Sequence, residues 1–304
     1  MSVRARNTAL VAVVAVATAI VLVTCGTITD IGATVGEATG TIDRRQAESI
    51  RRTGERMERS FEDFTPEQEY YIGRSVAATV LDHYPPYEND EVNEYLDTIG
   101  RIVVLASDRP SLFADYSFQV LDDDEVNAFA TPGGHIFLTR GMVRLAENED
   151  ELAAVLAHEV AHVVESHGLQ TIRTSRITAA LTSAAITGAQ FATSEEVAEL
   201  TEIFEGTIDD VTQTLFTAGY SRSAEREADQ GAVKILRRAG FAPSALASFL
   251  EHMDERWEPD GPGLARTHPS PSDRLRDVRA VLRDDDPEVD PRRSERFRRI
   301  MGHV

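Results

Sequence analysis

Two histidines, His158 and His162, stand four residues apart in this chain, and Glu159 directly follows the first of them. The surrounding segment, 149–167, has the apolar spacing of a helix. Residues four apart lie on one face of a helix, so both imidazole rings can reach a single metal ion while Glu159 projects beside it. The pattern therefore predicts a metal site on one helix, to which the rest of the fold must bring the remaining ligands.

Zinc is the metal that this arrangement of two histidines favours. Zinc lowers the pKa of a bound water molecule to about 7, so Glu159 can take a proton from that water and later pass it to a leaving amine. Such a site hydrolyses a peptide bond without a covalent intermediate. The sequence thus indicates one zinc ion per chain, with His158 and His162 as ligands and Glu159 as the catalytic base.

The third ligand does not lie on the same helix. Metalloproteases that take a third histidine from this segment have glycine and histidine where this chain has Glu165 and Gly168. His167 is one residue away from the required position, and we interpret it as a cation at the C-terminal end of the helix, which Gly168 terminates. A glutamate from a later helix is the other solution.

The segment 223–238 supplies that glutamate. Glu225 and Asp229 are four residues apart and share a helix face, so Glu225 can bind the metal while Asp229 accepts a ring N–H from His158. Glu227 faces another direction, and we interpret it as a solvated charge or as the partner of a neighbouring arginine.

The remaining periodicities predict a mostly helical α+β domain. Alternating apolar residues indicate three short strands, the last two joined by a Thr-Pro-Gly-Gly turn, and we expect a small antiparallel sheet packed on the helix of His158 and His162. The first helix is expected to begin with a capping box at Thr65 and Gln68. The expected strands are 116–121, 126–130 and 135–139, and the expected helices are 66–84, 91–107, 149–167, 223–238 and one from 271 onward.

Four motifs resemble, in the same order, those of one group of gluzincin metalloproteases: NAFATPGG, HEVAH, SRSAEREAD and THPSPSDR. The group includes the CAAX prenyl protease, HtpX, the mitochondrial Oma-type proteases and BepA, and the resemblance extends from about residue 61 to about residue 282. It implies a zincin-like zinc endopeptidase domain of α+β type. It also implies that Asn127, Ala128, Phe129 and Ala130 form an edge strand that pairs with extended substrate. From the residues alone, ordinary hairpin packing of this strand is the alternative.

His268 is the histidine of the fourth motif. The resemblance implies that it can bind the metal as an extra ligand and hold the enzyme closed. A histidine in a proline-rich loop is also compatible with two other roles, a hydrogen-bond donor to the tetrahedral oxyanion and a solvent-exposed loop residue. We assign His268 to the catalytic site with these three roles open.

The N-terminal segment predicts export. Arg4 and Arg6 precede an apolar run at 9–23, which is typical of a signal peptide. Cys25, the single cysteine, ends a segment that resembles a bacterial lipobox, so we expect it to carry a lipid. An uncleaved membrane anchor and an incidental cysteine are the alternatives.

These patterns divide the chain into four predicted parts. We expect residues 1–25 to be a signal peptide with lipobox or a membrane anchor, and 26–60 to be a tether with an exposed helix. The zinc metalloprotease domain is expected at 61–283, followed by a charged and peripheral C-terminal tail at 284–304.

The charge balance excludes one class of partner, because a formal net charge of −20 opposes binding to nucleic acid. We predict a membrane-tethered zinc endopeptidase of the cell envelope that cleaves unfolded or misassembled envelope proteins. Its catalytic domain would lie outside the cytoplasm, on the periplasmic side in a Gram-negative host. The alternative is an envelope assembly chaperone with a largely closed, gated zinc site.

Overall fold

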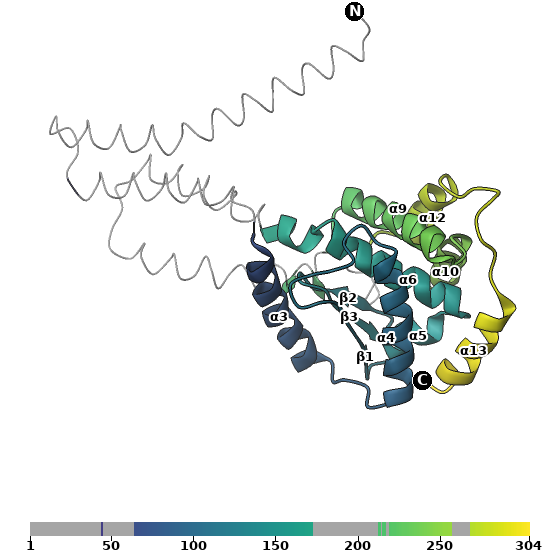
Figure 1. Cartoon of the computed structure of the whole chain (residues 1–304), viewed down its shortest axis with the longest axis horizontal. Coiled ribbons are helices and arrows are strands. Elements are labelled where there is room, and N and C mark those ends of the chain that lie inside the picture. Colours follow the sequence, from purple (N-terminus) through teal and green to yellow (C-terminus); the bar gives the residue numbers. More distant parts are fainter. Residues whose placement is uncertain (1–43, 45–63, 173–211, 214, 217–218, 257–267) are drawn as a thin grey trace, which may run out of the picture. The chain divides into compact units, whose positions relative to one another are not determined.

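The computed structural model describes residues 44, 64–172, 212–213, 215–216, 219–256 and 268–304 (Figure 1). The predicted signal peptide or anchor, Cys25 and the tether therefore lie outside the described residues. Contacts divide the chain into two units, and nearly all described residues belong to the unit made of 64–171 and 208–304, which is the one discussed below. Within the described ranges, no helix has both the length and the apolarity needed to cross a bilayer.

Helices make up most of the described domain, which confirms the predicted fold class. Two of them precede the sheet and the others follow it (Figure 1). In chain order they are α3 (Pro66–His83), α4 (Asp90–Leu105), α5 (Arg140–Leu145), α6 (Glu149–Val164), α9 (Arg222–Ala239), α10 (Ser244–Glu255), α12 (Pro271–Arg279) and α13 (Pro291–Met301).

The sheet has three strands, β1 (Ser117–Leu121), β2 (Ala128–Ala130) and β3 (His135–Thr139), in the order β1-β3-β2. β2 and β3 form the predicted antiparallel hairpin, but β1 pairs with β3 in parallel, so the sheet is mixed rather than antiparallel. The reason is topological. The chain reverses after β1, and the hairpin then places β3 between β1 and β2, where it runs in the same direction as β1.

Side-chain caps begin α3 and α6, and the cap of α3 is the one that the sequence predicts. Thr65 and Gln68 form a capping box at the start of α3, and the Asn148 side chain accepts a hydrogen bond from the backbone N–H of Glu151 at the start of α6. α9 ends at Gly240, whose φ of 78° is in the left-handed region that glycine adopts without strain.

The predicted end of α6 is wrong. The helix ends at Val164 instead of continuing to Gly168, because Ser166 adopts a left-handed conformation with a φ of 56°. The chain turns there, and residues 167–172 are helical again. His167 therefore lies after the turn and is not a cation on the last turn of α6.

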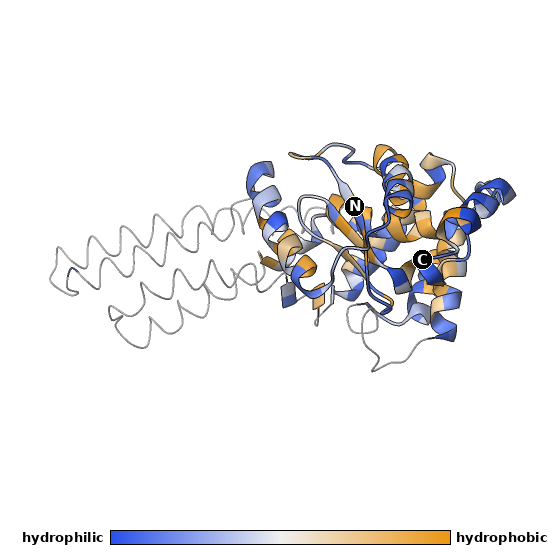
Figure 2. Cartoon of the chain, turned by 90° about the horizontal axis from the view of Figure 1, so that it is seen from below, coloured by the Kyte–Doolittle hydropathy of each residue, from blue (hydrophilic) through white to orange (hydrophobic). Residues whose placement is uncertain are grey.

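α6 lies in the interior of the domain, and all its residues from Glu149 to Val163 are buried. α4, α9, α10 and the sheet surround it, and hydrophobic residues gather in this interior (Figure 2). α9 crosses α6 closely, since a Cβ added to Gly231 would lie 2.8 Å from the Cβ of Ala161. This crossing brings the predicted third ligand helix onto the helix that carries the histidine pair.

The C-terminal segment belongs to the domain, which corrects the prediction of a peripheral tail after residue 283. Phe297 and Met301 on α13, together with Val304, are buried in the main hydrophobic core. Their spacing of four and three residues is that of one helix face, but the arginines between them hide this pattern in the sequence.

Candidate metal centre

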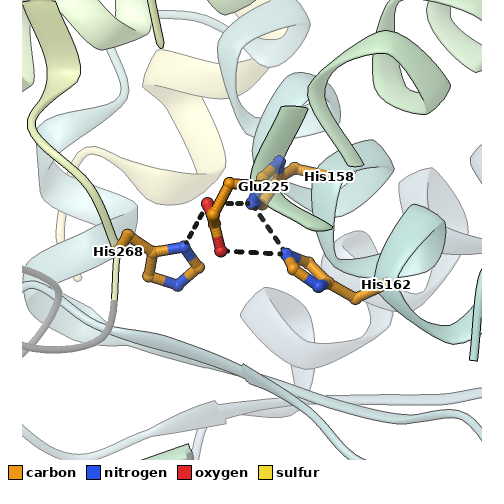
Figure 3. A group of neighbouring side chains, drawn as sticks. All are labelled: His158, His162, Glu225 and His268. Atoms are coloured by element: carbon orange, nitrogen blue, oxygen red, sulfur yellow. Dashed lines mark hydrogen bonds and ion pairs between the residues drawn. The ribbon is translucent and has the colours of Figure 1, made fainter. Parts of the chain in front are cut away.

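α6 presents His158 and His162 on one face, as the helical spacing predicts. Both side chains are almost completely buried, and their Nε2 atoms face each other at 3.1 Å (Figure 3). Two imidazole nitrogens that both accept cannot bond to each other directly, so a cation or a proton must lie between them.

α9 brings Glu225 to the same point. Its carboxylate oxygens lie 3.6 Å from His158 Nε2 and 3.5 Å from His162 Nε2, and its side chain is 1% exposed. The structure thus brings together the three ligands that the sequence predicts, although Glu225 follows the two histidines by more than sixty residues in the chain (Figure 3).

His268 is the fourth donor of this cluster. It directly precedes the loop into α12, and its Nδ1 lies 2.8 Å from Glu225 Oε2 (Figure 3). The residue is 9% exposed, so the interpretation of His268 as a solvent-exposed loop residue is wrong. Its position beside the ligand set agrees with both the gating role and the oxyanion role.

The donor set fits a metal ion. Nitrogen ligands about 2.0–2.1 Å from a tetrahedral zinc lie about 3.3 Å apart, which is close to the separation of the two Nε2 atoms. Ligand atoms of His158, His162, Glu225 and His268 all lie within 4.8 Å of one another. Glu225 Oε1 is buried and has no hydrogen-bond partner within the described part of the chain, as expected for an oxygen that binds a cation.

Asp229 and Arg274 lie beside His158 Nδ1, the ring nitrogen that faces away from the cluster. Asp229 Oδ1 lies 3.0 Å from His158 Nδ1, the contact that the sequence predicts. Arg274 forms two hydrogen bonds to the same carboxylate, from Nε at 3.0 Å and from Nη2 at 2.7 Å, and all three side chains are buried. The sequence patterns predict no role for Arg274, although it belongs to the fourth motif, six residues after His268.

The charges of the cluster shift the pKa values of its members. Burial favours the neutral form of Glu225, but His268, His158 and His162 outweigh it and hold the pKa of Glu225 well below its usual range. Burial and the positive charge of His158 lower the pKa of His162. Burial and Arg274 also oppose protonation of His158, yet its contacts with Asp229 and Glu225 raise its pKa to about 9. Anionic Glu225 and neutral His162 are in the states that bind a metal, whereas His158 must lose a proton.

Glu159 is buried beside these ligands on α6. Burial raises the pKa of its carboxyl, and the neighbouring His158 and His268 partly oppose this shift. A general base is most effective when its pKa is close to the working pH, which is above the usual pKa of a carboxyl group. The structure therefore places Glu159 in surroundings that suit the predicted role.

The predicted substrate strand lies at the edge of the sheet. In the described ranges, β2 pairs only with β3, and Asn127 to Ala130 are all buried. The ring of Phe216 covers Phe129 at a centroid distance of 5.2 Å. Ala130 and His162 line one small cavity, so the end of β2 lies next to the predicted metal ligands.

Two further aromatic side chains, which the sequence patterns do not predict at the site, contact His162. His167 Nδ1 lies 3.0 Å from His162 Nδ1, and the Tyr220 ring stacks on His162 at a centroid distance of 4.4 Å. Glu227 approaches His167 Nε2 at 3.4 Å, while Arg226 pairs with Asp277. The Glu227 side chain is 58% exposed, in agreement with the predicted solvated charge, and it also approaches a buried histidine.

A helix with two buried histidines and a glutamate, completed by a glutamate from a second helix on a mostly helical α+β fold, defines a metallopeptidase of the gluzincin class. Comparison with known families agrees, because the model of peptidase family M48 matches residues 90–282. The chain belongs to peptidase family M48.

Named relatives are proteases. A putative beta-barrel assembly-enhancing protease of Vibrio cholerae is 32% identical over 226 residues, which cover 72% of this chain and 45% of that protein. The beta-barrel assembly-enhancing protease of Escherichia coli K12 is 28% identical, over 70% of this chain and 43% of that protein. The mitochondrial metalloendopeptidase OMA1 of Schizosaccharomyces pombe is 28% identical, over 74% of this chain and 64% of that protein. The chain therefore spans less than half the length of the two bacterial relatives.

Proposed function

We propose that this protein is a zinc-dependent endopeptidase that hydrolyses unfolded or misassembled proteins of the cell envelope. The observation that carries the proposal is the buried cluster of His158, His162 and Glu225, with Glu159 on the same helix as the two histidines. Imidazole and carboxylate donors in this number suit zinc, with one ion per chain.

The residues around the cluster divide the chemistry among them. Bound zinc supplies a Lewis acid that lowers the pKa of a water molecule and polarises the scissile carbonyl. Glu159 takes the proton from the attacking water and delivers it to the leaving amine. Asp229 and Arg274 fix the ring of His158, so the site needs little reorganisation during the reaction.

The substrate class follows from the strand beside the cluster. An extended polypeptide that pairs with the edge of β2 opposite β3 would carry its scissile bond past His162, because Ala130 and His162 line the same cavity. An unfolded or misassembled chain offers extended backbone for such pairing. The names of the bacterial relatives, which refer to β-barrel assembly, support an envelope substrate.

Tethering is part of the proposal. Lipidation at Cys25, or a retained anchor helix in the N-terminal apolar run, would hold the catalytic domain at the membrane outside the cytoplasm. Labelled palmitate should be incorporated into the wild type and not into Cys25→Ser. A wild type that takes up no label would contradict lipidation.

A second candidate function rests on His268. Its position beside Glu225 supplies a fourth protein donor, and a zinc site closed by four protein ligands does not turn over substrate. An envelope assembly chaperone with a largely closed, gated site would have this arrangement.

One experiment separates the two functions. The full-length chain in detergent is assayed for zinc content and for cleavage of unfolded casein, as wild type, Glu159→Gln, His268→Ala and the control Glu165→Gln, which changes an exposed glutamate just after α6. We expect one zinc per chain in all four variants. Cleavage should fall by a factor of about 100 or more in Glu159→Gln, because the general base is lost.

The His268→Ala result assigns the role of that residue. Faster cleavage than in the wild type indicates a gate, and slower cleavage indicates a donor to the oxyanion. Zinc without cleavage in any variant would favour the chaperone, and protein that binds no zinc would overturn the site itself.

A further inference from the structure

Both ligand histidines of α6 have a buried partner at the ring nitrogen that faces away from the cluster. For His158 that partner is Asp229, as expected for a metal ligand. For His162 it is another histidine, His167, whose Nδ1 lies 3.0 Å from His162 Nδ1. The side chain of His167 is 1% exposed, so water cannot replace this contact.

Two imidazole nitrogens at this distance share one proton, and the surroundings decide which ring carries it. His162 turns its Nε2 toward His158 and Glu225, and a metal ligand needs its lone pair at that atom. The proton of neutral His162 is then on Nδ1, which donates to Nδ1 of His167. The proton of His167 is consequently on Nε2, where Glu227 Oε2 lies 3.4 Å away.

The local backbone explains how a residue only five positions after His162 reaches its ring. Ser166 has a φ of 56°, which turns the chain sharply after α6 and directs His167 back toward the helix. The rings of His162 and His167 meet edge to face, at 72° and a centroid distance of 4.9 Å. Tyr220 stacks on the face of His162 at an interplanar angle of 23°. The His162 ring is therefore held at its edge and on its face.

We propose that His167 is a positioning residue for metal binding, which accepts the Nδ1–H of His162 and thereby fixes the tautomer and orientation of that ligand. The inference rests on the proposed function, because it concerns the same metal site. Partners of this kind change metal affinity by about 10- to 100-fold when they are removed. His167 does not touch the reacting atoms, so its effect reaches catalysis only through His162.

The test uses two substitutions of His167 that differ in whether the new side chain can accept a hydrogen bond. In His167→Asn the amide oxygen can take the place of Nδ1 as acceptor, whereas His167→Leu has nearly the same volume and no acceptor. The full-length wild type, both variants and His303→Ala, a control that removes an exposed histidine, are titrated with zinc against a chelator of known affinity. Unfolding of the metal-free proteins in urea is measured in parallel.

We expect zinc affinity to fall about 10- to 100-fold in His167→Leu and to stay within about threefold of the wild type in His167→Asn and His303→Ala. Equal affinities of the Leu and Asn variants would overturn the inference, because the presence of an acceptor at position 167 would then make no difference to metal binding. A wild type that binds no zinc would overturn the proposed function as well, so the two failures are distinguishable.

Discussion

Arg274 is the buried cation behind the metal ligands. It binds both oxygens of Asp229, and its Nη2 lies 3.2 Å from His158 Nδ1, which already faces Asp229. Burial would raise the pKa of Asp229, but Arg274 and His158 outweigh it and lower that pKa. Arg274 therefore keeps Asp229 ionised, and the orientation of His158 depends on this pair.

Substitution of Arg274 tests this dependence. Arg274→Gln leaves a buried carboxylate without its cation, so we expect the free energy of unfolding to fall by about 3–5 kcal/mol. Arg274→Lys should lower the free energy of unfolding by a smaller amount, because lysine keeps the positive charge. Some loss remains, because lysine cannot form the paired hydrogen bonds. Urea unfolding of the metal-free protein measures both changes.

Arg276 provides the matched control on the same helix. Its side chain is 74% exposed and its ion pairs are 3.7 and 3.9 Å long. Arg276→Gln should change the free energy of unfolding by less than about 0.5 kcal/mol. Equal effects at positions 274 and 276 would show that Arg274 is not needed to hold Asp229.

At the scale of the elements, the separation of α6 and α9 sets the geometry of the proposed metal site, because each helix supplies part of the candidate ligand set. Gly231 and Ala161 meet where the helices cross, and a Cβ on Gly231 would lie 2.8 Å from the Cβ of Ala161. Real Cβ atoms do not approach so closely, and both atoms are fixed to helix backbones. A larger residue at either position must push the helices apart.

Gly231→Ala should therefore be destabilising, although alanine is the better helix former. The crowding costs about 1–3 kcal/mol, against about 1 kcal/mol gained in helix propensity. In a double-mutant cycle with Ala161→Gly, we expect the second substitution to relieve part of the crowding, with a coupling free energy of about 1 kcal/mol. Additive effects of the two substitutions would contradict the close crossing.

At the scale of the whole domain, the C-terminal helix closes the structure around the start of α6. Arg293 Nη1 lies 2.8 Å from Asp150, and Arg296 binds both oxygens of Glu149 at 2.5 and 2.7 Å. The Tyr95 hydroxyl on α4 donates to the same Glu149 at 2.5 Å. α13 thus contacts the first turn of the helix that carries the histidine pair.

Phe297 is the buried anchor of α13, with 5% of its surface exposed. We expect Phe297→Ala to lower the free energy of unfolding by about 3–5 kcal/mol, through lost burial and the cavity that remains. Phe113→Ala is the control, because Phe113 is 54% exposed and should tolerate the change within about 0.5 kcal/mol. Thermal unfolding of both variants measures these changes. If α13 were peripheral, the two substitutions would lower the stability by the same small amount.

Features that depend on neighbours along the chain could be predicted from the amino-acid sequence. The positions of His158, Glu159 and His162 on one helix face follow from the helical repeat, and the start of α3 follows from the side chains of its first turn. Glu225 and Asp229 were predictable for the same reason, once a second ligand helix was required.

Contacts between distant segments could not be predicted in this way, because they depend on how the whole chain packs. Arg274 meets His158 across 116 residues, Arg296 meets Glu149 across 147, and the parallel pairing of β1 with β3 depends on where the hairpin lies. His167 is close to His162 in sequence, yet its role depends on a left-handed residue at Ser166 that no local preference for serine indicates. A periodic pattern reports which face of an element is buried, whereas the partner on that face is chosen by packing of the whole chain.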